Sequence, residues 1–336
     1  MDVRDQYQRP AKDLRISVTD RCNFRCLYCM PLSDYARVER RELLTFEEIV
    51  RLVRLFVRLG VEKIKLTGGE PLLRRNLEEL VAQLVAIPGV RDLCLTTNGA
   101  LLAEKAERLR AAGLRRVNVS VDTLDPEKFR RITQRGDLGR VLDGLFEAQR
   151  VGLHPVKINA VIERGVNEDD ILPLARFALQ HGFALRFIEY MDVGTANQWR
   201  WEKVVPKAEI VRILMREFPL REVGRERESD TAVRYQLADG RGDIGIIASV
   251  TEPFCAGCTR VRLTSDGKLV TCLFSTDGYD VKALLRGNAS DEEILAVLRR
   301  VWEARRDRYS EERLDAWRAG RSLPRYPRME MIRLGG

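Results

Sequence analysis

Three cysteines within eight residues constrain this chain more than any other feature of its sequence. Cys22, Cys26 and Cys29 follow an alternating run, 14–19, that is typical of a β-strand. Three thiolates at this spacing can hold three corners of a cubic iron–sulfur cluster and leave the fourth iron open to another ligand. A closed zinc site would need a fourth Cys or His nearby, which the flanking sequence lacks. On spacing alone, two alternatives remain. The three cysteines could belong to a zinc knuckle whose fourth ligand lies elsewhere in the chain, or they could be free thiols.

The composition describes a globular chain with enough apolar material for a core, since 45% of its 336 residues are hydrophobic and 32% are charged. It contains no apolar run of about 18 residues, and its start lacks the apolar segment of a signal peptide. We therefore expect a cytoplasmic protein with no membrane partner. Lys and Arg outnumber Asp and Glu by 58 to 50, an excess that suits a phosphorylated small molecule. No recognition-helix or RNA-binding signature is present, so we expect no nucleic-acid partner.

The remaining cysteines fall in two places. Cys94 lies between two leucines, where a buried thiol is expected. Cys255, Cys258 and Cys272 repeat the pattern of three thiols. A thioredoxin-type redox pair would need a strand before and a helix after the Cys-x2-Cys pair, and a zinc site again lacks a nearby fourth ligand. A second iron–sulfur cluster with an open iron is the interpretation that these residues favour.

Strand-like and helix-like segments alternate six times in the first part of the chain. The expected strands lie at 14–19, 62–67, 92–97, 115–121, 156–162 and 183–190. Thr45 begins one intervening helix with a capping box, and Asp125 caps another that starts at Pro126. This alternation requires parallel strands with right-handed crossovers. Six units are too few for a closed eight-stranded barrel, so we predict an α/β fold with an incomplete (β/α)6 TIM-like barrel, whose sites lie at the carboxyl ends of the strands.

The alternation stops near residue 192. Two antiparallel strands joined by a turn are expected beyond it, at 231–237 and 243–249. We predict that residues 1–195 form the barrel core and residues 196–336 a smaller α+β region. This second region would carry the second cysteine set and attach in part to the open edge of the barrel. Residues 1–12 are polar, and we predict a loosely ordered arm there.

The cysteine spacings carry a family resemblance. Cys-x3-Cys-x2-Cys with Tyr28 before the last cysteine resembles the cluster motif of the radical S-adenosylmethionine (SAM) enzymes. Within them, three features together resemble the GTP 3′,8-cyclases of molybdenum-cofactor biosynthesis. They are the stretch 255–274, the Thr-Gly-Gly-Glu-Pro segment at 67–71 and the double glycine at the end. The resemblance extends from about residue 14 to the last residue.

The resemblance implies two 4Fe-4S clusters and SAM as cofactors and GTP as substrate. Cys22, Cys26 and Cys29 would hold the SAM-cleaving cluster. Cys255, Cys258 and Cys272 would hold the second cluster, which binds the guanine base. The implied SAM contacts are Tyr28, Gly69, Ser120 and Met191. The implied GTP contacts are Arg15, Lys63, Lys65, Thr96, Lys157, Arg186, Arg260 and Arg262, whose converging cations suit a triphosphate. Relatives can carry Arg at the position of Lys65. The Lys65 ammonium group would contact GTP as a point charge, without the paired N–H donors of a guanidinium.

The implied reaction converts GTP to (8S)-3′,8-cyclo-7,8-dihydroguanosine 5′-triphosphate, an early step of molybdopterin biosynthesis. Cleavage of SAM yields a 5′-deoxyadenosyl radical, which removes hydrogen from ribose C3′, and the C3′ radical attacks guanine C8. Gly335 and Gly336 are predicted to form a narrow tail that enters the barrel mouth and takes part in catalysis. A disordered chain end at the surface is the alternative. We expect an electron donor of flavodoxin or ferredoxin type. A homodimer is compatible with the sequence, which does not fix the oligomeric state.

Two other functions remain open on the sequence. A radical SAM enzyme that modifies a peptide would share both cysteine sets but would not select GTP. A basic zinc protein that binds nucleic acid would be colourless. Two cubic clusters would instead give a brown protein with about eight irons, counting roughly four per cluster.

Overall fold

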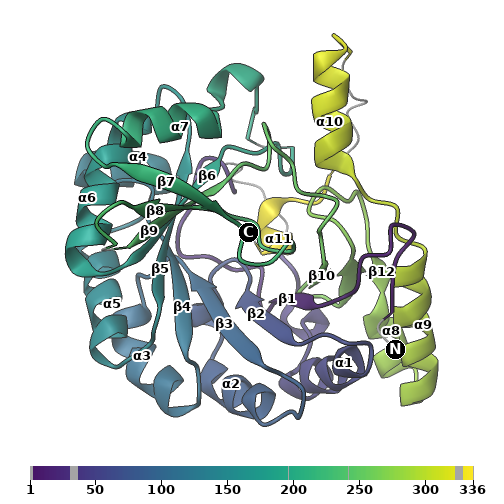
Figure 1. Ribbon diagram of the computed structural model, residues 1–336. Helices are drawn as coiled ribbons and strands as arrows, with labels where there is room; N and C mark the ends of the chain where they lie inside the picture. The colour runs from purple at the N-terminus through teal and green to yellow at the C-terminus, as the bar shows by residue number, and fades with distance from the viewer. Residues whose placement is uncertain (1–2, 31–36, 196, 241, 322–327, 336) are drawn as a thin grey trace.

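The computed structural model describes residues 3–30, 37–195, 197–240, 242–321 and 328–335. Over these residues one twelve-stranded sheet curls around a central opening, in the order β12-β11-β10-β1-β2-β3-β4-β5-β6-β9-β8-β7 (Figure 1). The first six strands are β1 (Asp13–Ser17), β2 (Lys63–Thr67), β3 (Asp92–Thr97), β4 (Arg116–Ser120), β5 (Val156–Ile162) and β6 (Ala184–Glu189). All neighbours among these six pair in parallel, which confirms the predicted incomplete barrel.

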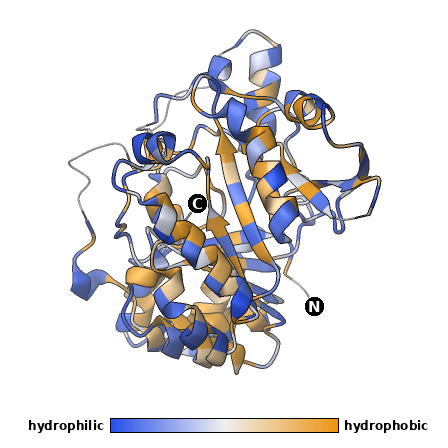
Figure 2. Cartoon of the chain, turned by 90° about the vertical axis from the view of Figure 1, so that its left-hand side faces the viewer, coloured by the Kyte–Doolittle hydropathy of each residue, from blue (hydrophilic) through white to orange (hydrophobic). Residues whose placement is uncertain are grey.

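Helices cover the outer face of the six parallel strands (Figure 1). They are α1 (Phe46–Arg58), α2 (Leu77–Val85), α3 (Leu102–Ala111), α4 (Pro126–Thr133), α5 (Leu138–Arg150) and α6 (Ile171–His181). Thr45 forms the predicted capping box of α1, and Asp125 caps α4. Apolar strand residues such as Leu14, Ile64 and Leu95 belong to the buried core that joins strands and helices. Figure 2 shows strands with both apolar and polar segments next to helices of mixed hydropathy. The alternate strand positions face the barrel interior and are largely polar.

The second half of the chain extends both edges of the barrel sheet. β10 (Arg260–Leu263) pairs in parallel with β1, and β9 (Asp243–Ile247) pairs in parallel with β6. The other strands are β7 (Leu220–Gly224), β8 (Val233–Leu237), β11 (Lys268–Val270) and β12 (Tyr279–Asp280). β8 and β9 are antiparallel, as predicted. The division at residue 195 stays a prediction, because one continuous sheet includes strands from both sides of it.

The remaining helices are α7 (Lys207–Leu214), α8 (Val281–Arg286), α9 (Asp291–Glu303), α10 (Tyr309–Arg318) and α11 (Met331–Leu334). α9 lies beside α1, to which Arg51–Asp291 and Arg58–Glu292 ion pairs connect it. α10 projects away from the sheet, whereas α11 lies near the centre of the barrel opening (Figure 1). Among the described residues, no helix has the length and apolar character needed to cross a lipid bilayer.

The prediction of a loosely ordered arm at the N-terminus is wrong for residues 3–12. Val3, Asp5, Arg9 and Ala11 are each at most 3% exposed. Asp5 accepts hydrogen bonds from the backbone N–H groups of Tyr7 and Arg9, and its carboxylate pairs with the Arg9 guanidinium at 2.6 Å. The polar composition misled the prediction because these polar groups satisfy one another inside the fold rather than contacting water.

Candidate active site

The register of the sheet brings cationic side chains together inside the barrel. Arg15 of β1 lies opposite Lys65 of β2 on one side and Arg262 of β10 on the other. Arg260 lies two residues before Arg262 on β10, so the two guanidiniums share a face of the sheet, as the sequence predicted. Three strands from distant parts of the chain therefore direct basic side chains into one space.

Among the described residues, a cavity of about 220 Å³ in this space is strongly cationic. Its cations are Arg15, Lys63, Lys65, Arg116, Lys157, Arg186, Arg227 and Arg260, and its carboxylates are Asp13, Asp92, Glu226 and Asp230. Six of these eight cations are predicted GTP contacts. The sequence analysis missed Arg116 and Arg227.

Several of these cations, Arg15 and Lys65 among them, form no ion pair within the described residues. Arg116, by contrast, is paired with Asp92, with Nε 2.8 Å from a carboxylate oxygen. Arg262, the register neighbour of Arg15 just outside this cavity, is buried, and its Nε has no hydrogen-bond partner among the described residues. Burial and the charge of Arg260 lower the pKa of Arg15 to about 10. Burial also lowers the pKa of Lys65 well below its usual value. Buried charges without partners are costly, so this cavity suits an anion that would neutralise them.

An adjoining cavity of about 210 Å³ reaches the carboxyl ends of the strands. It shares Arg15, Lys65, Arg186 and Arg260 with the cationic cavity. Its other lining residues from the sequence prediction are Tyr28, Thr96, Ser120, Met191, Cys255, Cys258, Arg262 and Cys272. The structure thus brings the second cysteine set and most of the predicted SAM and GTP contacts to one continuous region.

The first cysteine set lies in the loop after β1. Cys22 Sγ accepts a hydrogen bond from the Phe24 backbone N–H at 3.4 Å and lies 3.8 Å from Asn98 Nδ2. Burial raises the pKa of the Cys22 thiol to about 11 and that of the Cys29 thiol to about 12. A bound cationic iron centre would favour their thiolate forms. The thiol donors and nearby hydrogen-bond donors therefore fit an iron–sulfur cluster.

The second cysteine set lies in the loops around β10 and β11. Burial alone would raise the pKa of the Cys258 thiol, but the guanidiniums of Arg260 and Arg305 lower it to about 6. Burial raises the pKa of Cys272 to about 12. Among the described residues, no three or more His, Cys, Asp or Glu side chains are arranged as ligands of one metal ion. The assignment of both cysteine sets as cluster ligands therefore depends on their motifs and donor chemistry.

Two family matches divide the chain between them. Residues 16–178 match the Radical SAM superfamily, and residues 183–311 match Molybdenum Cofactor Synthesis C, a range that includes the second cysteine set. A protein of Acidothermus cellulolyticus named GTP 3′,8-cyclase is 51% identical over 93% of this chain and 88% of its own length. One of the same name from Aquifex aeolicus is 47% identical over 99% of each chain. The chain belongs to the GTP 3′,8-cyclase family. Its radical SAM core implies a 4Fe-4S cluster and SAM as cofactors, and the second family match is consistent with a second cluster.

Solved structures of radical SAM enzymes share the fold. Streptococcus suis SuiB bound to its precursor peptide SuiA has a TM-score of 0.60 and 17% identity, over 92% of this chain and 68% of its own. Native anSMEcpe with bound AdoMet has a TM-score of 0.56 and 17% identity, over 85% and 83%. At this identity the likeness concerns the fold alone. The near-full-length cyclase relatives favour the cyclase over the peptide-modifying and zinc-protein alternatives.

Gly69 lies where only glycine fits in this cyclase-family member. Its N–H donates to the Thr19 carbonyl at 2.7 Å, and a Cβ on Gly69 would clash with the carbonyl of Arg21. The strand-to-helix turn after β2 therefore packs directly on the loop that precedes the cysteines. Gly69 does not line either cavity, so its contact with SAM stays a prediction.

Two buried carboxylates support the site, and the sequence analysis gave neither a role. Glu70 accepts hydrogen bonds from Thr97 Oγ1 and from the Asn98 backbone N–H, each at 2.7 Å. Burial raises the pKa of Glu70 to about 7. Asp122 accepts from the Tyr28 hydroxyl at 2.8 Å, and burial raises its pKa to about 6. Glu70 thereby positions the Asn98 loop beside the first cysteines, and Asp122 orients the Tyr28 ring at the cavity.

The last described residue, Gly335, lies at the barrel mouth. It ends α11 with a φ of +63°, and a Cβ there would clash with the methyl group of Thr67 at the carboxyl end of β2. Arg333 anchors this segment through an ion pair with Asp266 at 2.5 Å. Gly335 thus lies beside the carboxyl end of β2, and its catalytic role stays a prediction, whereas Gly336 lies outside the described residues.

Proposed function

We propose that this chain is a GTP 3′,8-cyclase that converts GTP to (8S)-3′,8-cyclo-7,8-dihydroguanosine 5′-triphosphate, an early step of molybdenum-cofactor biosynthesis. The observation that carries this proposal is the incompletely neutralised cationic cavity, which adjoins a second cavity lined by three cysteines. Family membership supports the same conclusion.

The two cysteine sets would hold the cofactors. Cys22, Cys26 and Cys29 would bind the cluster that holds SAM, with Tyr28, Gly69, Ser120 and Met191 as SAM contacts. When bound, these groups supply the adenosyl radical that removes the C3′ hydrogen of GTP. The chain itself orients Tyr28 through Asp122 and places Ser120 and Met191 on the wall of the same cavity. Gly335, beside Thr67, would narrow the barrel mouth and exclude water from the reacting centre.

The shape of the site supports one orientation of GTP. The triphosphate would lie in the cationic cavity, held by Lys63, Lys157 and Arg260, and the base would face Cys255, Cys258 and Cys272. Arg15, Lys65 and Arg186 line both cavities, so they would contact the region between base and phosphates. Fixing GTP at both ends would hold C3′ and C8 in a reactive arrangement, which is the main contribution of the protein to such chemistry.

The proposed reaction also has requirements outside the chain. The electron that it consumes would come from a donor of flavodoxin or ferredoxin type. Seven cysteines that are all free among the described residues suit a reducing compartment, and we propose the cytoplasm. A homodimer stays a prediction, which analytical ultracentrifugation of the anaerobic protein would test.

Anaerobic turnover tests the proposal directly. The iron-loaded protein is incubated with GTP, SAM and a reductant, and we expect 5′-deoxyadenosine together with a cyclised nucleotide. ATP in place of GTP, and a Cys26→Ala variant with GTP, serve as controls and should yield no cyclised product. SAM cleavage that a peptide pool stimulates and GTP does not would contradict the proposed function and favour a peptide-modifying enzyme.

Lys157 should make GTP binding depend on pH. Burial and the neighbouring Arg186 and Arg116 lower the pKa of Lys157 to about 8, so in the free protein this amine loses its proton near that pH. A bound triphosphate favours the ammonium form, so binding takes up a proton and weakens as the pH rises through about 8. We expect affinity about tenfold lower at about pH 9.5 than at about pH 7.

Isothermal titration calorimetry in two buffers of different ionisation enthalpy would measure this proton uptake. Lys157→Arg keeps the positive charge and should make the pH dependence less steep, while Lys65, whose pKa is also lowered, still contributes to it. A wild-type affinity that is constant across this range, or an equally steep loss in Lys157→Arg, would contradict the role of Lys157.

A further inference from the structure

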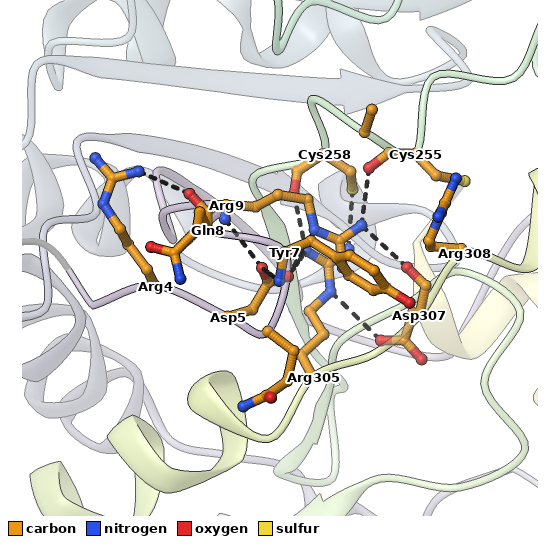
Figure 3. A network of polar contacts seen from close by, with 12 residues as sticks. Arg4, Asp5, Tyr7, Gln8, Arg9, Cys255, Cys258, Arg305, Asp307 and Arg308 are labelled. Atoms are coloured by element: carbon orange, nitrogen blue, oxygen red, sulfur yellow. Dashed lines mark hydrogen bonds and ion pairs between the residues drawn. The ribbon is translucent and has the colours of Figure 1, made fainter.

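The ordered N-terminal segment contacts the loop that carries Cys255 and Cys258. Figure 3 shows Arg9 and Arg305 extending from opposite ends of the sequence toward this loop. Arg9 Nη1 donates to the Cys255 carbonyl at 2.8 Å and to the Asp307 carbonyl at 3.0 Å. The family resemblance does not assign a function to any of these contacts. They place residues 3–12 and the α9–α10 linker against the second cysteine set.

The Arg305 side chain contacts a cysteine sulfur of this set. Its Nη2 lies 3.1 Å from Cys258 Sγ, and its Nη1 donates to the Cys258 carbonyl at 2.8 Å. The Arg305 side chain is 1% exposed, so water screens its charge little. A buried guanidinium that points at a ligand sulfur is a strong, charge-assisted hydrogen-bond donor.

Asp5 and Trp302 fix the position of this guanidinium. Arg305 Nη1 lies 3.3 Å from an Asp5 carboxylate oxygen, which also pairs with Arg9. The Arg305 guanidinium also lies over the Trp302 ring, 4.6 Å from its centroid. Trp302 is itself held, since its Nε1 donates to the Arg9 carbonyl at 3.0 Å. The N-terminal segment therefore helps determine where Arg305 points.

We infer that Arg305, positioned by Asp5 and Arg9 of the N-terminal segment, tunes the reduction potential of the second cluster through its hydrogen bond to Cys258. This inference rests on the proposed function, which places a cluster on Cys255, Cys258 and Cys272. Arg305 is a positioning residue, because it acts through a cluster ligand and does not touch substrate.

The direction of the effect follows from charge. Reduction adds a negative charge to the cluster and its thiolates, and a cation at 3.1 Å from one sulfur stabilises that form more than the oxidised form. The carboxylates of Asp5 and Asp307 pair with Arg305 and partly offset its charge, but the guanidinium is the group that lies against the Cys258 sulfur. Loss of Arg305 should therefore shift the midpoint potential to more negative values.

The experiment isolates the second cluster. In a parent variant with Cys22, Cys26 and Cys29 replaced by alanine, only the second cluster contributes to the electron paramagnetic resonance signal. The midpoint potential is measured by redox titration of the parent and of Arg305→Gln and Arg305→Lys in the same background. Asp5 keeps its ion pair with Arg9 in both variants, so its carboxylate is not left without a partner.

We expect Arg305→Gln to lower the midpoint potential by about 59 mV. For a one-electron couple, this shift changes the ratio of oxidised to reduced cluster at a fixed potential by about tenfold. Arg305→Lys keeps the charge and should shift the potential less. The matched control is Arg306→Gln, since Arg306 is the next residue in the same linker, is exposed, and forms no hydrogen bond or ion pair among the described residues. This control should leave the potential unchanged.

The outcomes separate this inference from the proposed function. A parent variant that binds no iron would contradict the second cluster and this inference together. A parent that holds the cluster, with the same midpoint potential in Arg305→Gln and in Arg306→Gln, would overturn the inference alone. Lower iron content in Arg305→Gln with an unchanged potential would show a merely structural role and would also overturn it.

Discussion

Arg262→Met is expected to weaken GTP binding on the order of a hundredfold and, at the same time, to stabilise the protein in the absence of GTP. The two effects have one physical cause. Arg262 is buried, its Nε has no hydrogen-bond partner among the described residues, and burial with the nearby Arg15 and Arg260 lowers its pKa to about 9. The folded protein therefore holds a buried charge whose Nε has no hydrogen-bond partner, and an anionic ligand would help to neutralise it.

Thermal unfolding without GTP and calorimetric titration with GTP measure the two effects separately. Arg116→Met provides a contrast, because Arg116 lines the neighbouring cationic cavity, is also partly buried, and forms a two-bond ion pair with Asp92. Removing Arg116 leaves the Asp92 carboxylate without this partner, so that variant should unfold at a lower temperature than the wild type. An Arg262→Met protein that binds GTP normally, or that loses stability without GTP, would contradict our account of the cationic cavity.

The family resemblance implied most of the cationic residues of the site, and the strand pattern indicated which of them share a face. Side chains alternate between the two faces of a strand, so Arg260 and Arg262 were expected on one face of their strand, and Lys63 and Lys65 on one face of theirs. The same alternation was available for Arg116, which begins the strand that ends at Ser120. It was missed because the sequence analysis considered that strand only at its carboxyl end.

The contacts around the second cysteine set were not predictable in the same way. Asp5 and Arg305 are 300 positions apart and form an ion pair, and no local periodicity indicates such a pairing. The N-terminal segment is polar, and polar terminal segments are commonly disordered. Its order depends on the contacts of Arg9 with the Cys255 loop and of Trp302 with Arg9, which form only in the folded chain.

Gly335→Ala is expected to lower turnover about a hundredfold while both cysteine sets retain their iron. A Cβ at Gly335 would overlap the methyl group of Thr67, so the C-terminal segment must move away from the end of β2. A displacement of about 1 Å at a reacting centre can cost on the order of a hundredfold in rate. Product formation and iron content of the same preparation would be measured together.

The chain offers a close control and a rescue for this prediction. Gly320 has the same φ of +63°, but a Cβ there would meet no atom within 4 Å, so Gly320→Ala carries the backbone strain without the clash. It should retain normal turnover. Thr67→Ala removes the two side-chain atoms nearest to the added Cβ, so the Gly335→Ala, Thr67→Ala double variant should recover part of the lost activity relative to Gly335→Ala alone. An equal loss of turnover in Gly320→Ala and Gly335→Ala would attribute the effect to backbone strain. Full turnover in Gly335→Ala would show that the close approach of the C-terminal segment to β2 is not required for catalysis.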